Sequence, residues 1–326
     1  MINQVINDYK ENFLRIEYMI GNICNYKCNY CFPGSNEGDK PWPDLAITKT
    51  NFSHLLDHYI SQGKNNFELF LIGGEPTIWK DLPALTKFLK SKYDISIHIS
   101  TNGSCSTKWW DKNAEFYDSI EISVHHEAAE VDHIISVADL IYEKNVHVVA
   151  NVMMDPRAFN KCKNMVEELK NSKHKWPILA KGVHFNGKTI YDEEQKKYFD
   201  PRIKRYPTLI RYLKMMKTGG RTKKVWVITD KNKKQKLPNE GWFVLNQLNY
   251  FEGWQCNLGV EYIRIHPTGE ITGNCMQKIY GIDYFYNLYD LEFKNKFKPT
   301  LASVICEKVM CLCTAEIVLN KKKIKV

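Results

Sequence analysis

Three closely spaced cysteines near the N-terminus are the first residues whose type and spacing could support chemistry. Cys24, Cys28 and Cys31 lie in the run CNYKCNYC. Three thiolates at this spacing can bind three irons of a four-iron cluster and leave the fourth iron open to a small molecule. A structural zinc site is the alternative, but the loop contains no histidine to complete it, and zinc sites favour closer CxxC pairs. The spacing therefore favours an iron–sulfur cluster.

A second group of cysteines lies between residues 256 and 313. Cys256 and Cys275 flank a predicted strand and a Pro-Thr-Gly turn, so we expect them to converge across a hairpin. Cys306, Cys311 and Cys313 follow, and together the five supply enough thiolates for a second four-iron cluster. A structural zinc site is again the alternative.

The elements that must position these residues begin with an alternation of strand-like and helix-like runs over the first 185 residues. This alternation is typical of βα units around a parallel sheet. A closed eight-unit barrel usually needs about 250 residues, so we predict an α/β fold with an incomplete (β/α)6 TIM-like barrel. The predicted strands are Leu14 to Ile20, Phe67 to Ile72, Ile95 to Ser100, Ile120 to Val124, Val146 to Met153 and Ile178 to Phe185.

The pattern changes after residue 186. Residues 207–218 are predicted to be helical, residues 223–236 a charged hairpin, and Tyr262 to Ile265 a short strand. We therefore divide the chain into a partial barrel (1–200), a basic linker and hairpin (201–250) and a smaller α+β domain (251–326).

Short motifs follow the predicted strands. GGEP (Gly73, Gly74, Glu75, Pro76) comes after the second strand, and STNG, with Ser100 and Asn102, ends the third. Glycines let the backbone approach a ligand closely, and hydroxyl and amide groups can hydrogen-bond to it. Because chemistry gathers at the carboxyl ends of parallel strands, we expect these motifs beside the first cysteine loop.

Together these motifs resemble the radical S-adenosylmethionine (radical SAM) superfamily. Its CxxxCxxC signature is matched by Cys24, Cys28 and Cys31, with Tyr30 at the aromatic position before the third cysteine. The resemblance implies that SAM chelates the open iron of a [4Fe–4S] cluster. Reductive cleavage then yields methionine and a 5′-deoxyadenosyl radical that abstracts hydrogen from a substrate. It also implies an external electron donor such as flavodoxin or ferredoxin.

The resemblance also implies which residues contact the cofactor. In GGEP, backbone carbonyls and the Glu75 carboxylate would receive the methionine ammonium group, and STNG would contact the ribose and carboxylate. The remaining residues that resemble polar cofactor contacts are Ser123, which ends the fourth strand, and Asn151, which lies in the fifth.

Two histidines stand where relatives often carry an acidic residue. Peptide-modifying members read ISLDG where this chain reads ISVHH, so His125 or His126 could face the substrate as a hydrogen-bond donor or proton carrier. A structural role is the alternative.

The second cysteine group resembles the twitch domain, a shortened relative of the SPASM domain that holds one auxiliary cluster. Five cysteines are too few for the two clusters of a full SPASM domain. The CxxxxCxC ending also differs from the CxxC of some twitch domains, which leaves open which of Cys306, Cys311 and Cys313 are ligands. The resemblance implies a second [4Fe–4S] cluster that accepts an electron from a substrate radical or binds substrate.

Composition limits the remaining possibilities. The chain has no apolar stretch of the roughly 18 residues that cross a bilayer and no secretory signal, so we expect a cytoplasmic protein without membrane contact. The isolated Cys105 and Cys162 are expected to be ordinary buried residues. The net charge of +9, with seven basic residues between Arg221 and Lys236, allows an anionic partner such as nucleic acid but does not require one.

The substrate is not selected by any residue of the sequence. By resemblance we predict modification or oxidation of a peptide or protein. The alternative is a nucleotide, nucleic-acid base or other small molecule, favoured by the basic hairpin. A non-enzymatic, metal-stabilised nucleic-acid-binding protein would leave GGEP and STNG unexplained.

Overall fold

The computed structural model describes residues 2–183, 191–198, 225–237, 243, 248–273, 276–311 and 314–324. Its main feature is a nine-stranded sheet in the order β13-β12-β11-β2-β3-β4-β5-β6-β7. The predicted strands all form and run parallel as β2 (Phe13–Met19), β3 (Asn66–Ile72), β4 (Ile95–Thr101), β5 (Ser119–Val124), β6 (His147–Met154) and β7 (Ile178–Gly182).

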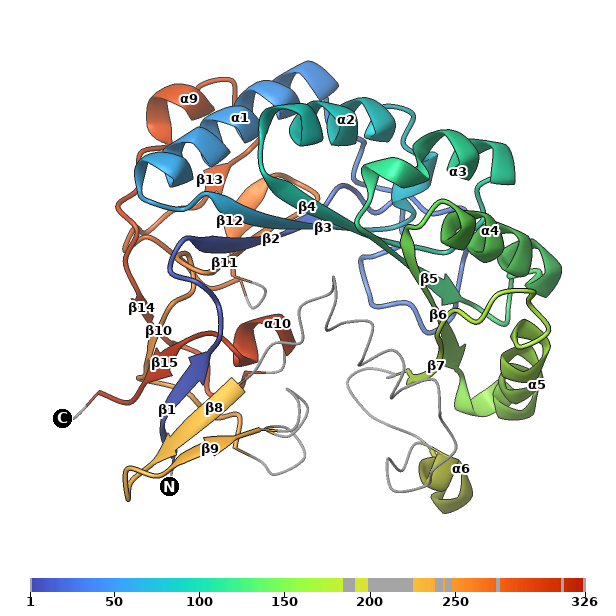
Figure 1. Cartoon of the computed structure of the whole chain (residues 1–326). Coiled ribbons are helices and arrows are strands. Elements are labelled where there is room, and N and C mark those ends of the chain that lie inside the picture. The colour runs from blue at the N-terminus through green and yellow to red at the C-terminus, as the bar shows by residue number, and fades with distance from the viewer. Residues whose placement is uncertain are drawn as a thin grey trace.

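The sheet curves into an open arc with helices on its outer face (Figure 1). The prediction of an incomplete barrel is therefore confirmed, because neither edge of the arc closes on the other. The covering helices are α1 (Leu45–Ser61), α2 (Leu82–Lys92), α3 (Thr107–Asn113), α4 (Val131–Glu143) and α5 (Phe159–Leu169), with short 3-10 turns η1 (Pro76–Ile78), η2 (Ala114–Phe116) and η3 (Pro156–Ala158).

Alternating side chains explain why the strands take this form. Leu69, Ile97 and Ile120 belong to the core that the strands share with the outer helices, and each is at most 1% exposed. Most positions between them on β4 and β5 carry polar groups, and Arg15 of β2 pairs with Glu68 of β3. A strand with one apolar and one polar face gives the period-two pattern that was read from the sequence.

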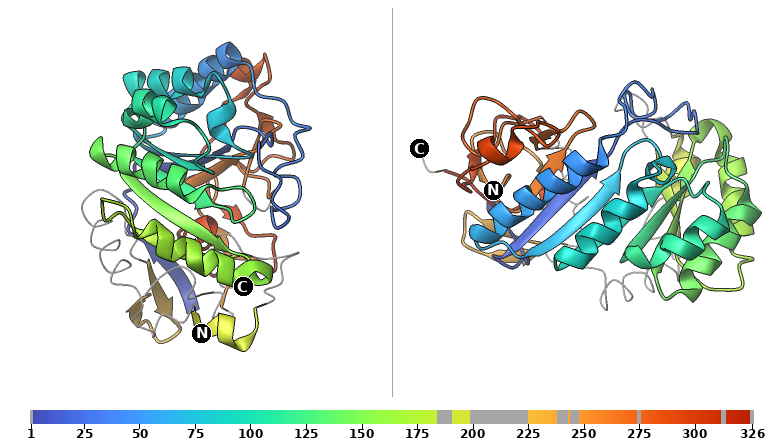
Figure 2. Two further views of the ribbon diagram at one scale, coloured as in Figure 1. Left: turned by 90° about the vertical axis from the view of Figure 1, so that its right-hand side faces the viewer. Right: turned by 90° about the horizontal axis from the view of Figure 1, so that it is seen from above.

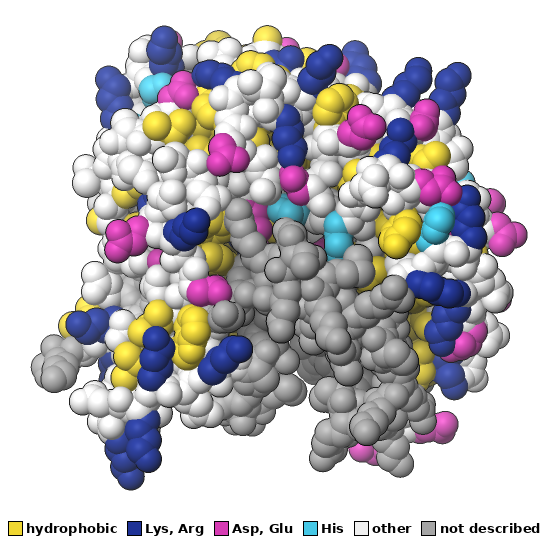
Figure 3. Space-filling view, in the orientation of Figure 1, with side chains coloured by type: hydrophobic (Ala, Val, Ile, Leu, Met, Phe, Trp, Pro, Cys, Tyr) yellow, Lys and Arg dark blue, Asp and Glu magenta, His cyan; other side chains and the backbone are white. Residues whose placement is uncertain are grey.

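A second, antiparallel sheet has the order β14-β10-β15-β1-β8-β9. The predicted charged hairpin is confirmed as β8 paired with β9, and its lysines gather at the lower left of Figure 3. The predicted helix at 207–218 lies outside the described residues. The strands of this sheet are β1 (Ile2–Asn7), β8 (Val225–Thr229), β9 (Lys234–Lys236), β10 (Gln255–Cys256), β14 (Val304–Ile305) and β15 (Lys321–Lys322).

Both sheets combine strands from distant parts of the chain. β1 pairs with β8 and β15, and the predicted strand at 262–265 forms as β11 (Tyr262–Ile265), which lies parallel to β2. The domain boundaries near residues 200 and 250 stay predictions. The remaining elements are β12 (Glu270–Thr272), β13 (Tyr286–Asn287), α6 (Glu193–Tyr198), α9 (Phe293–Lys296) and α10 (Thr314–Ile317). Within the described ranges, no helix has the length and apolar character needed to cross a membrane.

Candidate cofactor site

The three N-terminal cysteines lie on a long loop between β2 and α1 that is closed on itself by Asn22. The buried Asn22 side chain donates to the Gly34 carbonyl (3.0 Å) and to the Asp39 carboxylate (2.6 Å), and it accepts from the Lys40 amide (2.9 Å). Lys27 adds a 2.8 Å hydrogen bond from its ammonium group to the Asn36 carbonyl. The loop is therefore an ordered structure that can hold its thiols in fixed positions.

These thiols share one pocket with residues at the carboxyl ends of β3, β4 and β5. The structure thus brings together ten of the predicted residues, Thr101 of STNG included: Cys24, Cys28, Cys31, Gly73, Gly74, Ser100, Thr101, Asn102, Ser123 and His125. Four lining residues that sequence reasoning missed are Tyr26, Ser35, Asn36 and Ile72. Tyr26, Ser35 and Asn36 belong to the cysteine loop itself, so nearness to the cysteines was the available signal.

The predicted residues Tyr30, Glu75, Pro76, Asn151 and His126 do not line this pocket. Asn151 lies beside Ser123 in the sheet register and donates to Glu121 at 3.3 Å. The binding roles assigned to all of these residues stay predictions.

The two glycines of GGEP are needed for contact with the cysteine loop. A Cβ atom at Gly73, whose φ is +135°, would lie 2.4 Å from the Gly21 carbonyl oxygen, and one at Gly74 would lie 2.2 Å from that of Ile23. The Gly74 and Glu75 amides donate to these same two carbonyls at 3.0 and 2.8 Å. We expected these glycines to let the backbone approach a ligand. In the structure they let it approach residues 21–23, the segment that leads into Cys24.

Glu75 is fully buried beneath the pocket and binds protein groups. Its carboxylate accepts hydrogen bonds from the amide and hydroxyl of Thr77 (3.0 and 2.6 Å), the hydroxyl of Thr101 (2.7 Å) and the amide of Asn102 (2.5 Å). Burial raises the pKa of Glu75, and these hydrogen bonds offset part of that rise. Glu75 thus ties the end of β3 to the end of β4.

Asn102 links that strand end to the cysteine loop. Its side-chain amide lies 3.9 Å from the Cys24 sulfur and donates to the Asn25 side chain at 2.9 Å. The Cys24 sulfur also accepts from the Tyr26 amide at 3.3 Å. Hydrogen bonds of this kind stabilise a thiolate and orient it toward a metal.

His125 lies in the pocket against two tyrosines of the cysteine loop. Its ring stacks on Tyr30 (centroids 5.7 Å apart) with a 3.0 Å contact from Nδ1 to the phenol oxygen, and it meets the edge of Tyr26. Burial lowers the pKa of His125 to about 4, so the ring is neutral at pH 7. The neutral His125 ring can therefore form hydrogen bonds in the pocket, but it is not a protonated imidazolium that could act as an acid.

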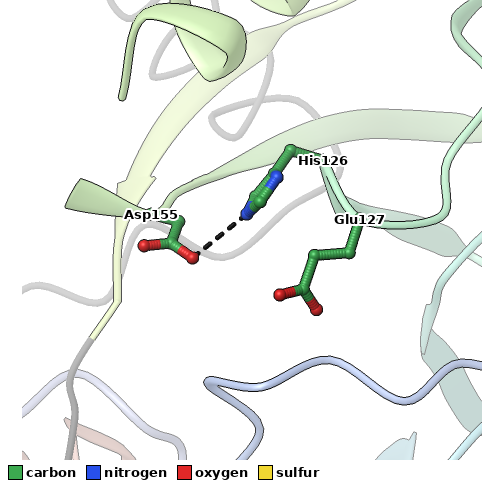
Figure 4. A group of neighbouring side chains, drawn as sticks. All are labelled: His126, Glu127 and Asp155. Carbon is green, nitrogen blue, oxygen red and sulfur yellow. Dashed lines mark hydrogen bonds and ion pairs between the residues drawn. The ribbon is translucent and has the colours of Figure 1, made fainter. Parts of the chain in front are cut away.

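His126, Glu127 and Asp155 form a cluster beside the loop (Figure 4). His126 hydrogen-bonds to Asp155 at 3.0 Å, and Arg157 forks onto the same carboxylate with nitrogen–oxygen distances of 2.7 and 3.0 Å. Burial opposes the charged form of Asp155, but the hydrogen bonds from Arg157 and His126 outweigh it and lower the pKa to about 2. Although the spacing of these ligand atoms suits a metal ion, they are already engaged with protein groups.

Glu127 binds the cysteine loop directly. Its two carboxylate oxygens accept from the backbone amide (2.9 Å) and the side-chain amide (3.0 Å) of Asn29, which directly follows Cys28. Glu127 thus acts as a brace for the segment that carries these two thiols.

We expect Glu127→Ala to weaken retention of the cluster, because Asn29 loses the two hydrogen bonds that it donates to Glu127. Iron loss to a chelator after anaerobic reconstitution should be about threefold to tenfold faster than in the unaltered protein, as expected for one or two lost hydrogen bonds. Glu130→Ala is the matched control, since Glu130 precedes α4 without a side-chain capping bond. Equal rates of iron loss in both variants would show that Glu127 does not hold the loop.

Burial of the three thiols limits how they can ionise. Burial raises the pKa of Cys24, Cys28 and Cys31, and the neighbouring Glu127 and thiols help to raise that of Cys28 to about 12. Three such thiols become thiolates together only when a positively charged group neutralises them. The donor set therefore fits a metal cluster held through sulfur.

The second cysteine group is described in part, because Cys275 and Cys313 lie outside the described residues. Cys256 is buried in β10, which pairs with β14, and the Cys306 amide donates to the Trp254 carbonyl at 2.8 Å. Cys306 and Cys311 both pack against the apolar cluster that contains Trp254. The hairpin predicted between Cys256 and Cys275 forms as β11 and β12.

Comparison with known proteins is consistent with this geometry. Residues 18–144, which include the first cysteine motif, GGEP and STNG, match the radical SAM superfamily. The chain is 26% identical over 157 residues to the GTP 3′,8-cyclase of Psychromonas ingrahamii, a match that covers 47% of this chain and 44% of that protein. The chain thus spans less than half the length of this curated relative.

Two solved structures of one protein share the fold. Native anSMEcpe with bound AdoMet aligns over 87% of this chain and 80% of its own, with a TM-score of 0.51 and 14% identity. The same protein with bound AdoMet and Cp18Cys peptide aligns over the same shares with a TM-score of 0.50 and 14% identity. Likeness at this level of identity concerns the fold alone. The family match shows that residues 18–144 of this chain form a radical SAM domain.

Proposed function

We propose that this protein binds a [4Fe–4S] cluster through Cys24, Cys28 and Cys31, cleaves SAM reductively and abstracts hydrogen from a substrate. One observation carries the proposal: three thiols from one loop share a pocket with Gly73, Gly74 and the polar ends of β4 and β5. A radical SAM domain implies both the cluster and SAM. When bound, they supply an electron and a carbon radical, and the protein supplies orientation and exclusion of water.

The residues around the pocket have separate roles in this function. Asn22 and Glu127 fix the shape of the cysteine loop, and the backbone of Gly74 and Glu75 anchors its start. Ser100, Asn102 and Ser123 present hydroxyl and amide groups suited to the polar parts of SAM. His125 adds a neutral ring that fills the pocket wall between Tyr26 and Tyr30.

We also propose that the second cysteine group holds an auxiliary [4Fe–4S] cluster in a twitch-like domain. Support comes from Cys256 and Cys306, which lie on the paired segments around β10 and β14. The backbone amide of Cys311 donates a 2.8 Å hydrogen bond to the Asn249 carbonyl, which fixes the position of this third cysteine. Such a cluster would accept an electron from the product radical.

A peptide or protein is the substrate we propose first, because the fold neighbour anSMEcpe has been solved with a bound peptide. A nucleotide is the second candidate, favoured by the GTP 3′,8-cyclase relative and by the exposed lysines of the β8–β9 hairpin. The matched region carries the cofactor motifs, which superfamily members share, so it does not choose between these substrates.

The test is anaerobic reconstitution with iron and sulfide, followed by counting iron and measuring 5′-deoxyadenosine after adding dithionite and SAM. We expect about eight irons per chain for two four-iron clusters. Cys28→Ala should retain about four irons and form no 5′-deoxyadenosine, whereas Cys256→Ala should also retain about four but still cleave SAM. Bound zinc without SAM cleavage would contradict the proposal. It would instead favour a non-enzymatic, metal-stabilised nucleic-acid-binding protein.

A further inference from the structure

The two faces of the antiparallel sheet differ in what they contact. Val5 of β1 and Val225 and Val227 of β8 belong to an apolar cluster on one side. Because side chains alternate along a strand, the positions between them face the other way. We call this other side the open face, and its described residues are Gln4, Ile6, Trp226, Ile228, Lys234, Lys236, Gln255, Ile305 and Lys322.

Apolar side chains occupy the middle of the open face. Ile6 lies opposite Trp226 in the register of β1 and β8, and Ile228 follows on the same side of β8. All three are partly exposed, and in the described part of the chain none belongs to an apolar core cluster. The solvated face of an antiparallel sheet usually carries polar side chains. An accessible apolar strip around a tryptophan therefore indicates a surface that a partner covers.

Lysines border this strip on both sides. Lys234 and Lys236 lie on β9 next to β8, and Lys322 lies on β15 on the far side of β1. All three are exposed, and among the described residues none is paired with an acidic side chain, unlike Lys40 and Lys90 on the partial barrel. Dark blue side chains adjoin yellow ones in this region, at the lower left of Figure 3. The right-hand view of Figure 2 places the region at the end of the molecule opposite α5.

We propose that the open face binds a single strand of nucleic acid, with phosphates on the lysines and bases on the ring of Trp226. Lysine ammonium groups neutralise phosphates, and an aromatic ring lets any base stack on it. The Lys234 ammonium lies 4.8 Å from the centroid of the Trp226 ring. A base that stacks there displaces this ammonium group onto a neighbouring phosphate, so the two kinds of contact form side by side.

Two other polyanions would also satisfy the lysines. An acidic peptide carries charge but no planar rings for the apolar strip. An anionic membrane calls for apolar side chains that reach into the lipid, whereas Trp226 is only partly exposed within a sheet. A single strand of nucleic acid combines a row of charges with flat apolar surfaces, and the net charge of +9 attracts it over long range.

The experiment measures binding of a fluorescein-labelled thymidine oligonucleotide of about twelve nucleotides, within the usual range of single-strand sites. Fluorescence anisotropy follows its binding to the reconstituted full chain at several salt concentrations. We expect Trp226→Ala to weaken binding about tenfold, as for loss of one stacked base, and Trp226→Phe to restore most of it. Replacing Lys234 and Lys236 together with glutamine should lower the slope of log K against log salt by about 1.4, since each phosphate contact of a single strand contributes about 0.7.

Lys108→Gln combined with Lys112→Gln on α3 is the matched control, because both lysines are exposed and their loss changes the net charge equally. Equal salt slopes in the two double variants would overturn the proposal, because overall charge would then explain binding. Unchanged affinity in Trp226→Ala would also overturn it. So would tighter binding of a polyglutamate peptide or of vesicles containing phosphatidylserine, which would assign the open face to another partner. SAM cleavage is not part of this test, so the proposed function stands or falls separately.

Discussion

Replacing Gly74 with alanine is expected to remove at least nine tenths of the iron bound by the first cysteine loop and to abolish SAM cleavage. The new Cβ would lie 2.2 Å from the Ile23 carbonyl oxygen and 2.8 Å from the Asn22 carbonyl carbon. Both atoms belong to backbone, which cannot rotate away as the end of a flexible side chain can. The segment leading into Cys24 must therefore move, and its thiol leaves the position shared with Cys28 and Cys31.

The measurement is iron and sulfide content after reconstitution, together with 5′-deoxyadenosine formation. Gly182→Ala is the control, because a Cβ at that position in β7 would meet no atom closer than 3.6 Å. It should bind iron like the unaltered protein. Gly74→Ala with a full cluster would show that the contact between GGEP and residues 21–23 does not position the cysteines.

Replacing Glu75 has the second large expected effect, and it acts on folding stability. Glu75→Ala leaves four donors of Thr77, Thr101 and Asn102 without their acceptor in a fully buried place. Each buried donor left unpaired costs about 1–3 kcal/mol, so we expect the free energy of unfolding to fall by at least about 3 kcal/mol. Urea unfolding under anaerobic conditions measures it.

A matched series separates this structural role from direct cofactor binding. Thr101→Val removes one of the four donors and leaves the Gly103 amide without its acceptor, so it should cost about 1–3 kcal/mol. Glu75→Gln keeps the size but turns an amide group toward donors, so its loss should lie between those of Thr101→Val and Glu75→Ala. If Glu75→Gln keeps full stability and only weakens SAM binding, the carboxylate binds the methionine ammonium group, as the family resemblance implies.

The strands of the barrel could be predicted because β2, β4 and β5 alternate between an apolar outer face and a mostly polar inner face, and β3 and β6 are short apolar runs between helical segments. Leu69 and Glu68 of β3 still lie on opposite faces, since one packs under the helices and the other pairs with Arg15. The partner of β11 could not be predicted. Four residues, Tyr262 to Ile265, mark a short strand, but nothing in their pattern encodes pairing with β2.

The site was predictable by residue type and less so by contact. Motif spacing placed Cys24, Gly74 and Ser100 at strand ends, and the structure brings them to one pocket. The sequence could not show that the Glu75 carboxylate is occupied by protein donors, nor that Glu127 reaches back almost a hundred residues to Asn29. Such pairings depend on how loops fold over the sheet, which local propensity does not determine.

The parallel pairing of β11 with β2 has a consequence for synthesis of the protein on the ribosome. The partner of β2 emerges almost 250 residues after it, since Arg15 lies opposite Tyr262. At roughly 5–20 residues per second, this delay lasts roughly ten to fifty seconds. During that time one edge of β2 stays unpaired, and the thiols that follow it lack their finished support. Iron loading at the first cysteine loop is therefore expected to follow the emergence of β11, and nascent chains would depend on protection of the β2 edge until then.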